Sequence, residues 1–285
     1  MSAALLEDAL VAAAPGPPRT RRRAHGHRLL GLLVPLLLLG AWYVVSSQEL
    51  LSTRLLPSPG TVATALGDFF AGDSTTTLAG VVPFTGAGFE HLGASLYRCG
   101  VSWLLAVAVG TVVGLLLGLS QLARDLLDPL LNALRAVPLF AWLPLALIWF
   151  GLGEGAARAI IFVGALWPVL VAVSDAVGRV PTAHVETARM LGTPRRWLWR
   201  RVYLPSALPE VVTGLRLSLT LAWTCVIVGE LSGTDRGVGA MMSAARETGR
   251  TEQVVVGIVV FATVGLVADL LLRAATARWV RWSRA

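Results

Sequence analysis

Residues able to do acid–base, nucleophilic or metal chemistry are few in this sequence, and they do not cluster. All 24 basic residues are arginine, so there is no Walker-type glycine-rich loop with its phosphate-binding lysine. No HExxH metal motif occurs, and the four histidines are scattered along the chain. Cys99 and Cys225 fall inside apolar runs and lack the spacing of metal ligands. The sequence therefore predicts no catalytic residue, no bound metal and no cofactor.

Polar, glycine and proline residues form one dense pattern, between residues 178 and 210. Pro181 suits a first helical position, and Gly192 suits the residue just after a helix end. Thr193 and Pro194 then supply an N-cap and a first-turn proline, and Pro205 ends the second helix after about Tyr203. The pattern predicts two short helices joined at a Gly-Thr-Pro corner. Such an ordered segment needs a rigid frame to hold it.

The frame is predicted to be a set of membrane-spanning helices. The chain is 55% hydrophobic and 14% charged with a mean hydropathy of +0.69, whereas soluble domains carry about 25% charged residues. A bilayer is crossed by roughly 17–25 apolar residues. Six stretches qualify: Leu29–Ser46, Leu96–Leu119, Leu130–Phe150, Ala157–Val177, Val211–Leu231 and Val254–Leu272. Pro138, Pro144 and Pro168 interrupt the third and fourth, which lipid-embedded helices tolerate where neighbours satisfy the freed carbonyls.

The arginines predict the orientation. With a cytoplasmic N-terminus, 18 of the 24 lie in segments that face the cytoplasm, which leaves six outside: Arg54, Arg98, Arg158, Arg236, Arg246 and Arg250. Short cytoplasmic loops carry such an excess of positive charge, so both termini are predicted to be cytoplasmic. The net charge of +7 then reflects topology and does not indicate nucleic-acid binding.

Four segments follow from this topology. Residues 1–27 are predicted to be a disordered cytoplasmic tail with a basic anchor, and residues 28–285 the membrane domain. The outer segment, 47–94, carries Val62, Leu66 and Phe69 at helical spacing, which predicts a short helix along the outer surface. Its 74–89 stretch is an insertion of unassigned role. The cytoplasmic loop is 178–210.

A structured, basic, aromatic-bearing loop on the cytoplasmic side has two interpretations. It is either a docking surface for a soluble protein or an amphipathic loop that rests on anionic lipid headgroups through Trp197 and Trp199. The physics of the loop alone leaves both open.

The loop resembles the EAA motif of ABC importer permeases: Glu-Ala-Ala, three residues, Gly, nine residues, Ile, one residue, Leu-Pro. This chain keeps the spacing, and Thr187 replaces the first Ala while Val202 replaces the Ile. The matching positions are Glu186, Thr187, Ala188, Gly192, Val202, Leu204 and Pro205. Other matching segments recur in order, namely Leu56–Pro59, Ala94–Arg98, Leu134–Pro138, Trp149–Glu154 and Gly237–Gly239. Together they are similar to the nitrate/sulfonate/taurine branch of this family over about residues 29–282.

This resemblance implies an all-α, six-span protein of the type I ABC importer permease kind in the bacterial inner membrane. It implies that the chain is not an enzyme and that separate ABC ATPase subunits receive the loop. A second permease copy, in a homodimer, would complete a pathway for a small anionic solute such as a sulfonate, taurine or nitrate. An extracytoplasmic binding protein would deliver that solute.

The charges in the spans bear on the energy source. Proton- or sodium-coupled transporters keep ionisable groups at mid-membrane. Here the charges are predicted to lie near span ends: Arg98, Arg135, Asp175, Arg216, Glu230 and Asp269. This favours a driving force from outside the membrane over the alternatives of a secondary transporter or a membrane scaffold. Glu230 is the candidate for lining the pathway or a gate, against the simpler interpretation of a solvated span end or a partner for an arginine.

Overall fold

The computed structural model describes residues 26–48, 52–53, 55–72 and 84–277, and every regular element within them is a helix. Residues 1–25 of the predicted tail and most of the 74–89 insertion lie outside the described residues, whereas residues 26 and 27 belong to a helix. Residues 1–50 and 51–285 form two units, which are described separately. The prediction of an all-α fold is confirmed for the described chain.

The first unit contains α2, Gly26–Ser47, which covers the first predicted span and has Pro35 inside it. Its apolar part, Leu33–Ser47, is shorter than the other candidate spans. The crossing of the membrane by α2 therefore stays a prediction.

The second unit begins with α3, Pro59–Ala71, a short helix where the apolar spacing predicts one. The Ser58 side chain caps it by accepting a hydrogen bond of 3.1 Å from the Thr61 N–H, and Pro59 occupies the first turn. Val62, Ala65 and Phe69 are buried, so α3 packs against the bundle through one face.

Among the described residues, four helices are long and apolar enough to cross a membrane. They are α4, Gly88–Leu119; α7, Glu154–Gly178; the continuous helix Arg196–Glu230, most of which is α10, Leu204–Glu230; and α12, Thr251–Thr276. They coincide with the second, fourth, fifth and sixth predicted spans. The short helix α11, Val238–Glu247, lies between α10 and α12 in the chain.

The third predicted span, Leu130–Phe150, is not one continuous helix, and its crossing of the membrane stays a prediction. Helix α5, Gln121–Ala136, ends at Val137, and the turn η2, Leu139–Trp142, leads into α6, Leu143–Phe150, after a bend of 95°. Val137 is extended (ψ 123°) because the ring of Pro138 disfavours helical backbone at the residue before it. Pro144 sits in the first turn of α6, where a proline is tolerated.

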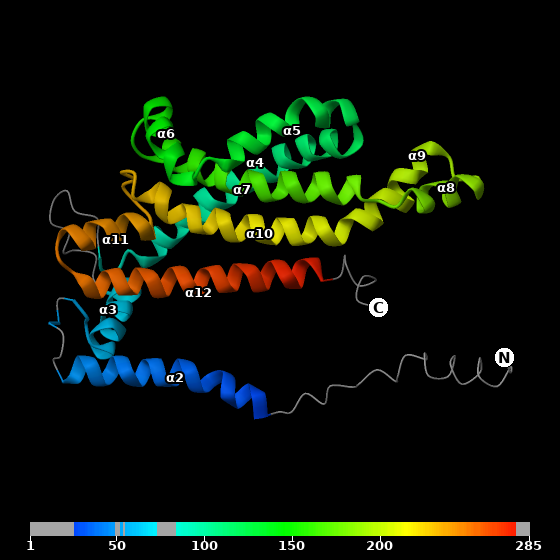
Figure 1. Ribbon diagram of the computed structural model, residues 1–285. Coiled ribbons are helices and arrows are strands. Elements are labelled where there is room, and N and C mark those ends of the chain that lie inside the picture. Colours follow the sequence, from blue (N-terminus) through cyan, green and yellow to red (C-terminus); the bar gives the residue numbers. More distant parts are fainter. Residues whose placement is uncertain (1–25, 49–51, 54, 73–83, 278–285) are drawn as a thin grey trace, which may run out of the picture. The chain divides into compact units, whose positions relative to one another are not determined.

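Helix α7 is the centre of the second unit, with α4 and α5 on one side and α10 on the other (Figure 1). It stays helical through Pro168. Gly110, Gly114 and Gly118 of α4 face α7 at successive turns, opposite Val169, Val173 and Val177. A Cβ on Gly114 would lie 2.8 Å from the Leu170 carbonyl oxygen. Small residues of this kind let two helix backbones approach closely, which stabilises helix pairs where lipid removes the hydrophobic driving force.

The two ends of this bundle differ. At one end α8, Thr182–Met190, and α9, Arg195–Leu198, extend beyond α7 and α10, and α11 lies at the other end (Figure 1). Tyr203 and Val211 pack with Leu115 on a buried cluster of Ala176, Val177 and Ala207, which fixes the start of α10 to the end of α7. The chain on either side of α8 and α9 is therefore held together by this packed cluster.

Candidate functional site

The predicted corner at Gly192 is confirmed in its backbone geometry. Gly192 has a φ of +78°, and its N–H donates to the Arg189 carbonyl at 2.9 Å. The Thr193 N–H donates to the Ala188 carbonyl at 3.0 Å. These two bonds form a Schellman motif, which ends α8 and satisfies its last carbonyls. A side chain at Gly192 would meet nothing within 4 Å, so the positive φ alone is what favours glycine here.

The second half of the loop differs from the prediction in two ways. Pro194 rather than Thr193 is the N-cap of α9, without a side-chain capping bond. Pro205 does not end a helix, because the chain continues through the π-turn η3, Trp199–Tyr203, into α10. The Leu204 N–H bonds to the Trp199 carbonyl, and Pro205 lies in the first turn of α10, where its missing N–H is tolerated.

The outer surface of α8 carries one acidic and two large apolar side chains. Glu186 is exposed, Met190 is 86% exposed and Leu191 is 80% exposed. The other side of the segment is fixed, since Val185 and Leu198 are buried. Arg189 is exposed as well, so the protruding segment presents charges of both signs beside large apolar side chains.

The other residues predicted for this site are distributed along the same segment. Thr187 is exposed, and its hydroxyl donates to the Ala183 carbonyl at 2.8 Å. Ala188 is half-buried. Val202 and Pro205 are half-buried and Leu204 is exposed, at the junction with α10. The structure therefore brings the predicted loop residues into one segment but leaves Glu230 at the far end of α10.

The Glu230 carboxylate is completely buried and fully hydrogen-bonded. Its Oε1 accepts from the Ser95 hydroxyl and from Arg98 Nη1, each at 2.6 Å, and its Oε2 accepts from the Gly239 N–H at 2.7 Å. The interpretation of Glu230 as a solvated span end is wrong, and the carboxylate is the partner of an arginine. A buried charge needs such a set of partners, because its desolvation is otherwise strongly unfavourable.

Arg98 links this carboxylate to a second one. Its guanidinium donates through Nε to Glu154 Oε1 at 2.8 Å, and Nη2 also contacts that oxygen. Glu154 is the first residue of α7, its side chain is 50% exposed, and it also accepts from Arg158 Nη2 at 3.1 Å. Helices α4, α7 and α10 thus meet at one guanidinium.

Two further bonds join α4 to the start of α11. The Gly237 N–H donates to His91 Nδ1 and the Val238 N–H donates to the Ser95 hydroxyl, both at 3.0 Å. His91 also stacks on the Phe69 ring of α3. We call His91, Ser95, Arg98, Glu154 and Glu230 the ionic cluster.

Sequence reasoning found Glu230 but missed its partners. Helix α4 begins at Gly88, eight residues before the predicted span, so Arg98 lies about three turns inside it and is buried. Arg216 lies well inside α10 and pairs with Asp269 of α12 at 3.1 Å. Both residues therefore lie inside long helices and away from the helix ends, while their depth in the membrane stays a prediction. The spacing of His91, Ser95 and Arg98 along one helical face was the available signal.

No three His, Cys, Asp or Glu side chains in the described part of the chain come together as a possible metal site. Cys99 and Cys225 are buried free thiols.

Residues 108–281 match the family of binding-protein-dependent transport system inner membrane components. The chain is 33% identical to the putative aliphatic sulfonates transport permease protein SsuC of Bacillus subtilis, covering 88% of this chain and 87% of that one. It is 36% identical to the taurine transport system permease protein TauC of Escherichia coli, covering 86% of each. It is 32% identical to the bicarbonate transport system permease protein CmpB of Synechococcus elongatus, covering 89% and 91%.

A solved structure has the same fold. The chain superposes on one from the inward facing conformations of the MetNI methionine ABC transporter, with a TM-score of 0.54 and 24% identity. The match covers 67% of this chain and 94% of that chain.

Proposed function

The chain belongs to the family of binding-protein-dependent transport system inner membrane components, and on that premise we propose that it carries a small anionic solute and is driven by a separate ATPase docked on residues 178–210. It is a multi-pass inner-membrane protein and the permease component of an ABC importer. The proposal adds the ATPase contact, delivery by a binding protein, and the class of solute.

One observation carries the ATPase contact: α8 projects from the junction of α7 and α10, and large apolar side chains at its end are exposed (Figure 1). Met190 and Leu191 are among the most exposed large apolar residues described, and they flank the Gly192 corner next to Glu186. Exposed apolar side chains beside a charge are typical of a protein interface. The helix–corner–helix is joined in the chain to α7 at one end and to α10 at the other, and these two ends pack together, so a movement of the docked ATPase would move both helices.

The solute class is supported by the relatives. Their names refer to aliphatic sulfonates, taurine and bicarbonate, and each of these carries a compact oxyanion. We extend that chemistry to this chain as its solute class. A binding protein would present the solute at the end of the bundle opposite the 178–210 segment, and two copies of the chain would enclose the pathway.

The ionic cluster supports a gate at that opposite end. Glu230 and Arg98 tie α4, α7 and α10 to the start of α11, so the loop before α11 moves only if buried charged contacts break. A segment that switches between two positions is expected to be held by a few strong contacts. Its buried charges must be paired in each position, so intermediate positions are unfavourable. Glu230 would then hold the gate in place rather than bind the solute.

The test compares matched variants in a reconstituted complex of the chain, its ATPase and its binding protein. Glu186→Lys reverses an exposed charge on α8, and Glu247→Lys makes the same change at the other end of the bundle, on α11. Gly192→Pro removes the corner, because proline cannot adopt a φ of +78°. The measurements are co-purification of the ATPase and solute-stimulated ATP hydrolysis.

We expect Glu186→Lys and Gly192→Pro to lose ATPase binding and stimulated hydrolysis, and Glu247→Lys to retain the ATPase. If the two loop variants keep both properties, the ATPase contact lies elsewhere. A transporter or scaffold that is not driven by ATP then becomes the better interpretation.

A further inference from the structure

A cavity of 500 Å³ lies between α3 and the start of α12, at the end of the bundle opposite the 178–210 segment (Figure 1). Threonine hydroxyls of α3 line it together with three charged side chains, Asp68, Arg250 and Glu252. Its volume falls within the range of small-molecule sites, about 300–1,000 Å³. No residue of the ionic cluster lines it, so the cavity is a separate feature of this end of the bundle.

Gln253 lines the cavity, although the residue is only 4% exposed. Its side-chain Oε1 is buried and has no hydrogen-bond partner in the part of the chain that the structure describes. Buried acceptors in proteins are nearly always hydrogen-bonded. This oxygen is therefore a candidate acceptor for a ligand that carries N–H or O–H donors.

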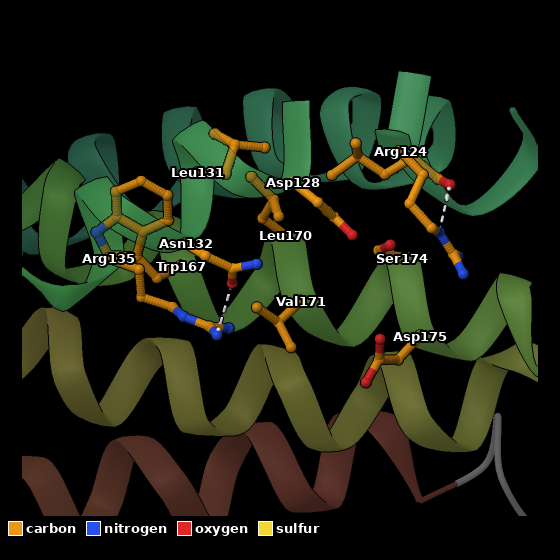
Figure 2. Close-up of a pocket in the computed structure, with 11 residues that line it drawn as sticks. Arg124, Asp128, Leu131, Asn132, Arg135, Trp167, Leu170, Val171, Ser174 and Asp175 are labelled. Atoms are coloured by element: carbon orange, nitrogen blue, oxygen red, sulfur yellow. Dashed lines mark hydrogen bonds between the residues drawn. The ribbon is translucent and has the colours of Figure 1, made fainter. Parts of the chain in front are cut away.

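The cavity between α5 and α7 lacks such an atom. Its volume is 250 Å³, and Figure 2 shows polar side chains of both helices around it. Arg124 Nε donates to the Leu117 carbonyl at 3.3 Å, and Arg135 Nη2 donates to Asn132 Oδ1 at 2.8 Å. Among the described residues that line this second cavity, no buried polar side-chain atom is without a partner. The unpaired acceptor therefore distinguishes the α3–α12 cavity from it.

The charged side chains around Gln253 have both signs. Asp68 and Glu252 form no ion pair within the described ranges, and neither does Arg250, whose guanidinium lies 5.1 Å from the centre of the Phe84 ring. Carboxylates and an amide oxygen suit an ammonium group, which donates hydrogen bonds only, and a guanidinium suits a phosphate. The lining thus fits a ligand that carries an ammonium and a phosphate together.

The cavity lies at the level expected for lipid headgroups. The apolar run of α12 begins at Val254, directly after Gln253, and the sixth predicted span extends from there to Leu272. Where an apolar span ends, the hydrocarbon core of a bilayer is expected to give way to the polar headgroup layer. In the predicted topology this is the outer leaflet.

An exposed apolar stripe runs along α12 away from the cavity. It follows Glu252 at whole numbers of helical turns, through Val259, Leu266 and Leu270, all of which are exposed. Exposed apolar surface next to a polar site is typical of a contact with lipid or protein. A lipid whose headgroup occupies the cavity would place its acyl chains on this stripe.

We propose that the α3–α12 cavity binds the headgroup of a membrane lipid that carries a primary ammonium beside a phosphate, of the phosphatidylethanolamine kind. Asp68, Glu252 and Gln253 accept hydrogen bonds from the ammonium. Arg250 binds the phosphate, and the acyl chains lie along α12. The inference requires only that the chain is a membrane protein, and it does not depend on the proposed ATPase contact or on the solute class.

The test counts lipids bound to the purified full chain in mild detergent by native mass spectrometry. The probes are phosphatidylethanolamine, phosphatidylcholine and phosphatidylglycerol with identical acyl chains. Phosphatidylcholine keeps the positive charge but has no N–H donor, and phosphatidylglycerol has no ammonium. Glycerophosphoethanolamine, which is the same headgroup without acyl chains, separates a lipid site from a site for a soluble ligand.

Each variant has a matched control. Gln253→Met removes the unpaired acceptor and no hydrogen bond that the described chain contains, so it should leave Tm unchanged or higher. Glu252→Gln is compared with Glu247→Gln, an exposed glutamate of α11 outside the cavity. Arg250→Gln is compared with Arg246→Gln, an exposed arginine in the last turn of α11.

We expect the wild-type chain to bind phosphatidylethanolamine about tenfold more tightly than either other lipid, which is the effect of one hydrogen bond to a charged group. Gln253→Met and Glu252→Gln should bring this ratio close to one. Arg250→Gln should weaken all three lipids by a similar factor and keep the ratio. Both control variants should match the wild type, and glycerophosphoethanolamine should bind far more weakly than the lipid.

Equal binding of the three lipids by the wild-type chain would overturn the inference, as would losses in the controls as large as those in the cavity variants. Binding of glycerophosphoethanolamine as tight as that of the lipid would assign the cavity to a soluble ligand instead. Weaker capture of the binding protein by Glu252→Gln, without any lipid preference in the wild type, would assign it to a protein contact. None of these measurements uses the ATPase, so the lipid site and the proposed function can fail separately.

Discussion

The contact between Arg98 and Glu230 predicts a large loss of stability when its carboxylate is neutralised. Glu230→Gln keeps the size of the side chain but removes the negative charge that faces a guanidinium with a side-chain exposure of only 3%. The new amide also places either an N–H₂ group or a neutral oxygen where the Gly239 N–H now meets Oε2. Arg98 keeps Glu154 as its one remaining counter-charge.

The expected magnitude follows from the burial of the pair. Removal of one partner of a buried ion pair costs about 3–5 kcal/mol, because the other charge stays buried and uncompensated. Glu154→Gln is the matched change on the same arginine, but its side chain is 50% exposed and Arg98 retains Glu230. Exposed ion pairs contribute about 0–1 kcal/mol. At roughly 2–4 °C per kcal/mol, Glu230→Gln should lower Tm by about 6–20 °C and Glu154→Gln by no more than about 4 °C.

The two cysteines make the assay direct. They are the only thiols in the chain, both are buried, and Cys99 is next to Arg98 in sequence. A dye that fluoresces on reaction with thiols therefore reports unfolding of α4 and α10 in detergent or nanodiscs. Equal Tm shifts for the two variants, or a larger shift for Glu154→Gln, would refute the reasoning that burial makes Glu230 the dominant partner.

Three further predictions concern backbone contacts and one indole. Gly114→Ala should lower Tm clearly, because its Cβ would lie 2.8 Å from a carbonyl oxygen of α7, whereas Gly100→Ala meets nothing within 4 Å and should be neutral or stabilising by about 1 kcal/mol. Gly192→Ala strains a φ of +78° and should reduce ATPase stimulation, while Gly249→Ala, with a φ of +71° and equally open space, should leave it unchanged in the same hydrolysis assay. Trp223→Phe removes a buried 2.9 Å bond to a carbonyl of α12, and should cost about 1 kcal/mol in the thiol-dye assay.

The long helices could be predicted because their signal is local in the chain. An apolar run of 20 residues is helical in a bilayer whatever surrounds it, since no other conformation satisfies its backbone. The third predicted span is a case in which the apolar run alone does not predict the path of the chain. Apolarity continues through Val137 and Pro138, but the helix stops there and turns by 95°, and the direction of α6 depends on what α5 and α7 leave open to it.

The 178–210 loop and the ionic cluster differ in the same way: local sequence determines the first, and long-range packing determines the second. A glycine after a run of helix formers, followed by proline, fixes the corner at Gly192 through contacts within six residues, so the sequence by itself determined it. The partner of Glu230 is 132 residues away in the chain. Only the close packing of α4, α7 and α10 brings Arg98 and Ser95 to that carboxylate and removes water from it. Tertiary structure therefore decided that the charge is paired, because burial and long-range contact are properties of the packed helices and not of any one of them.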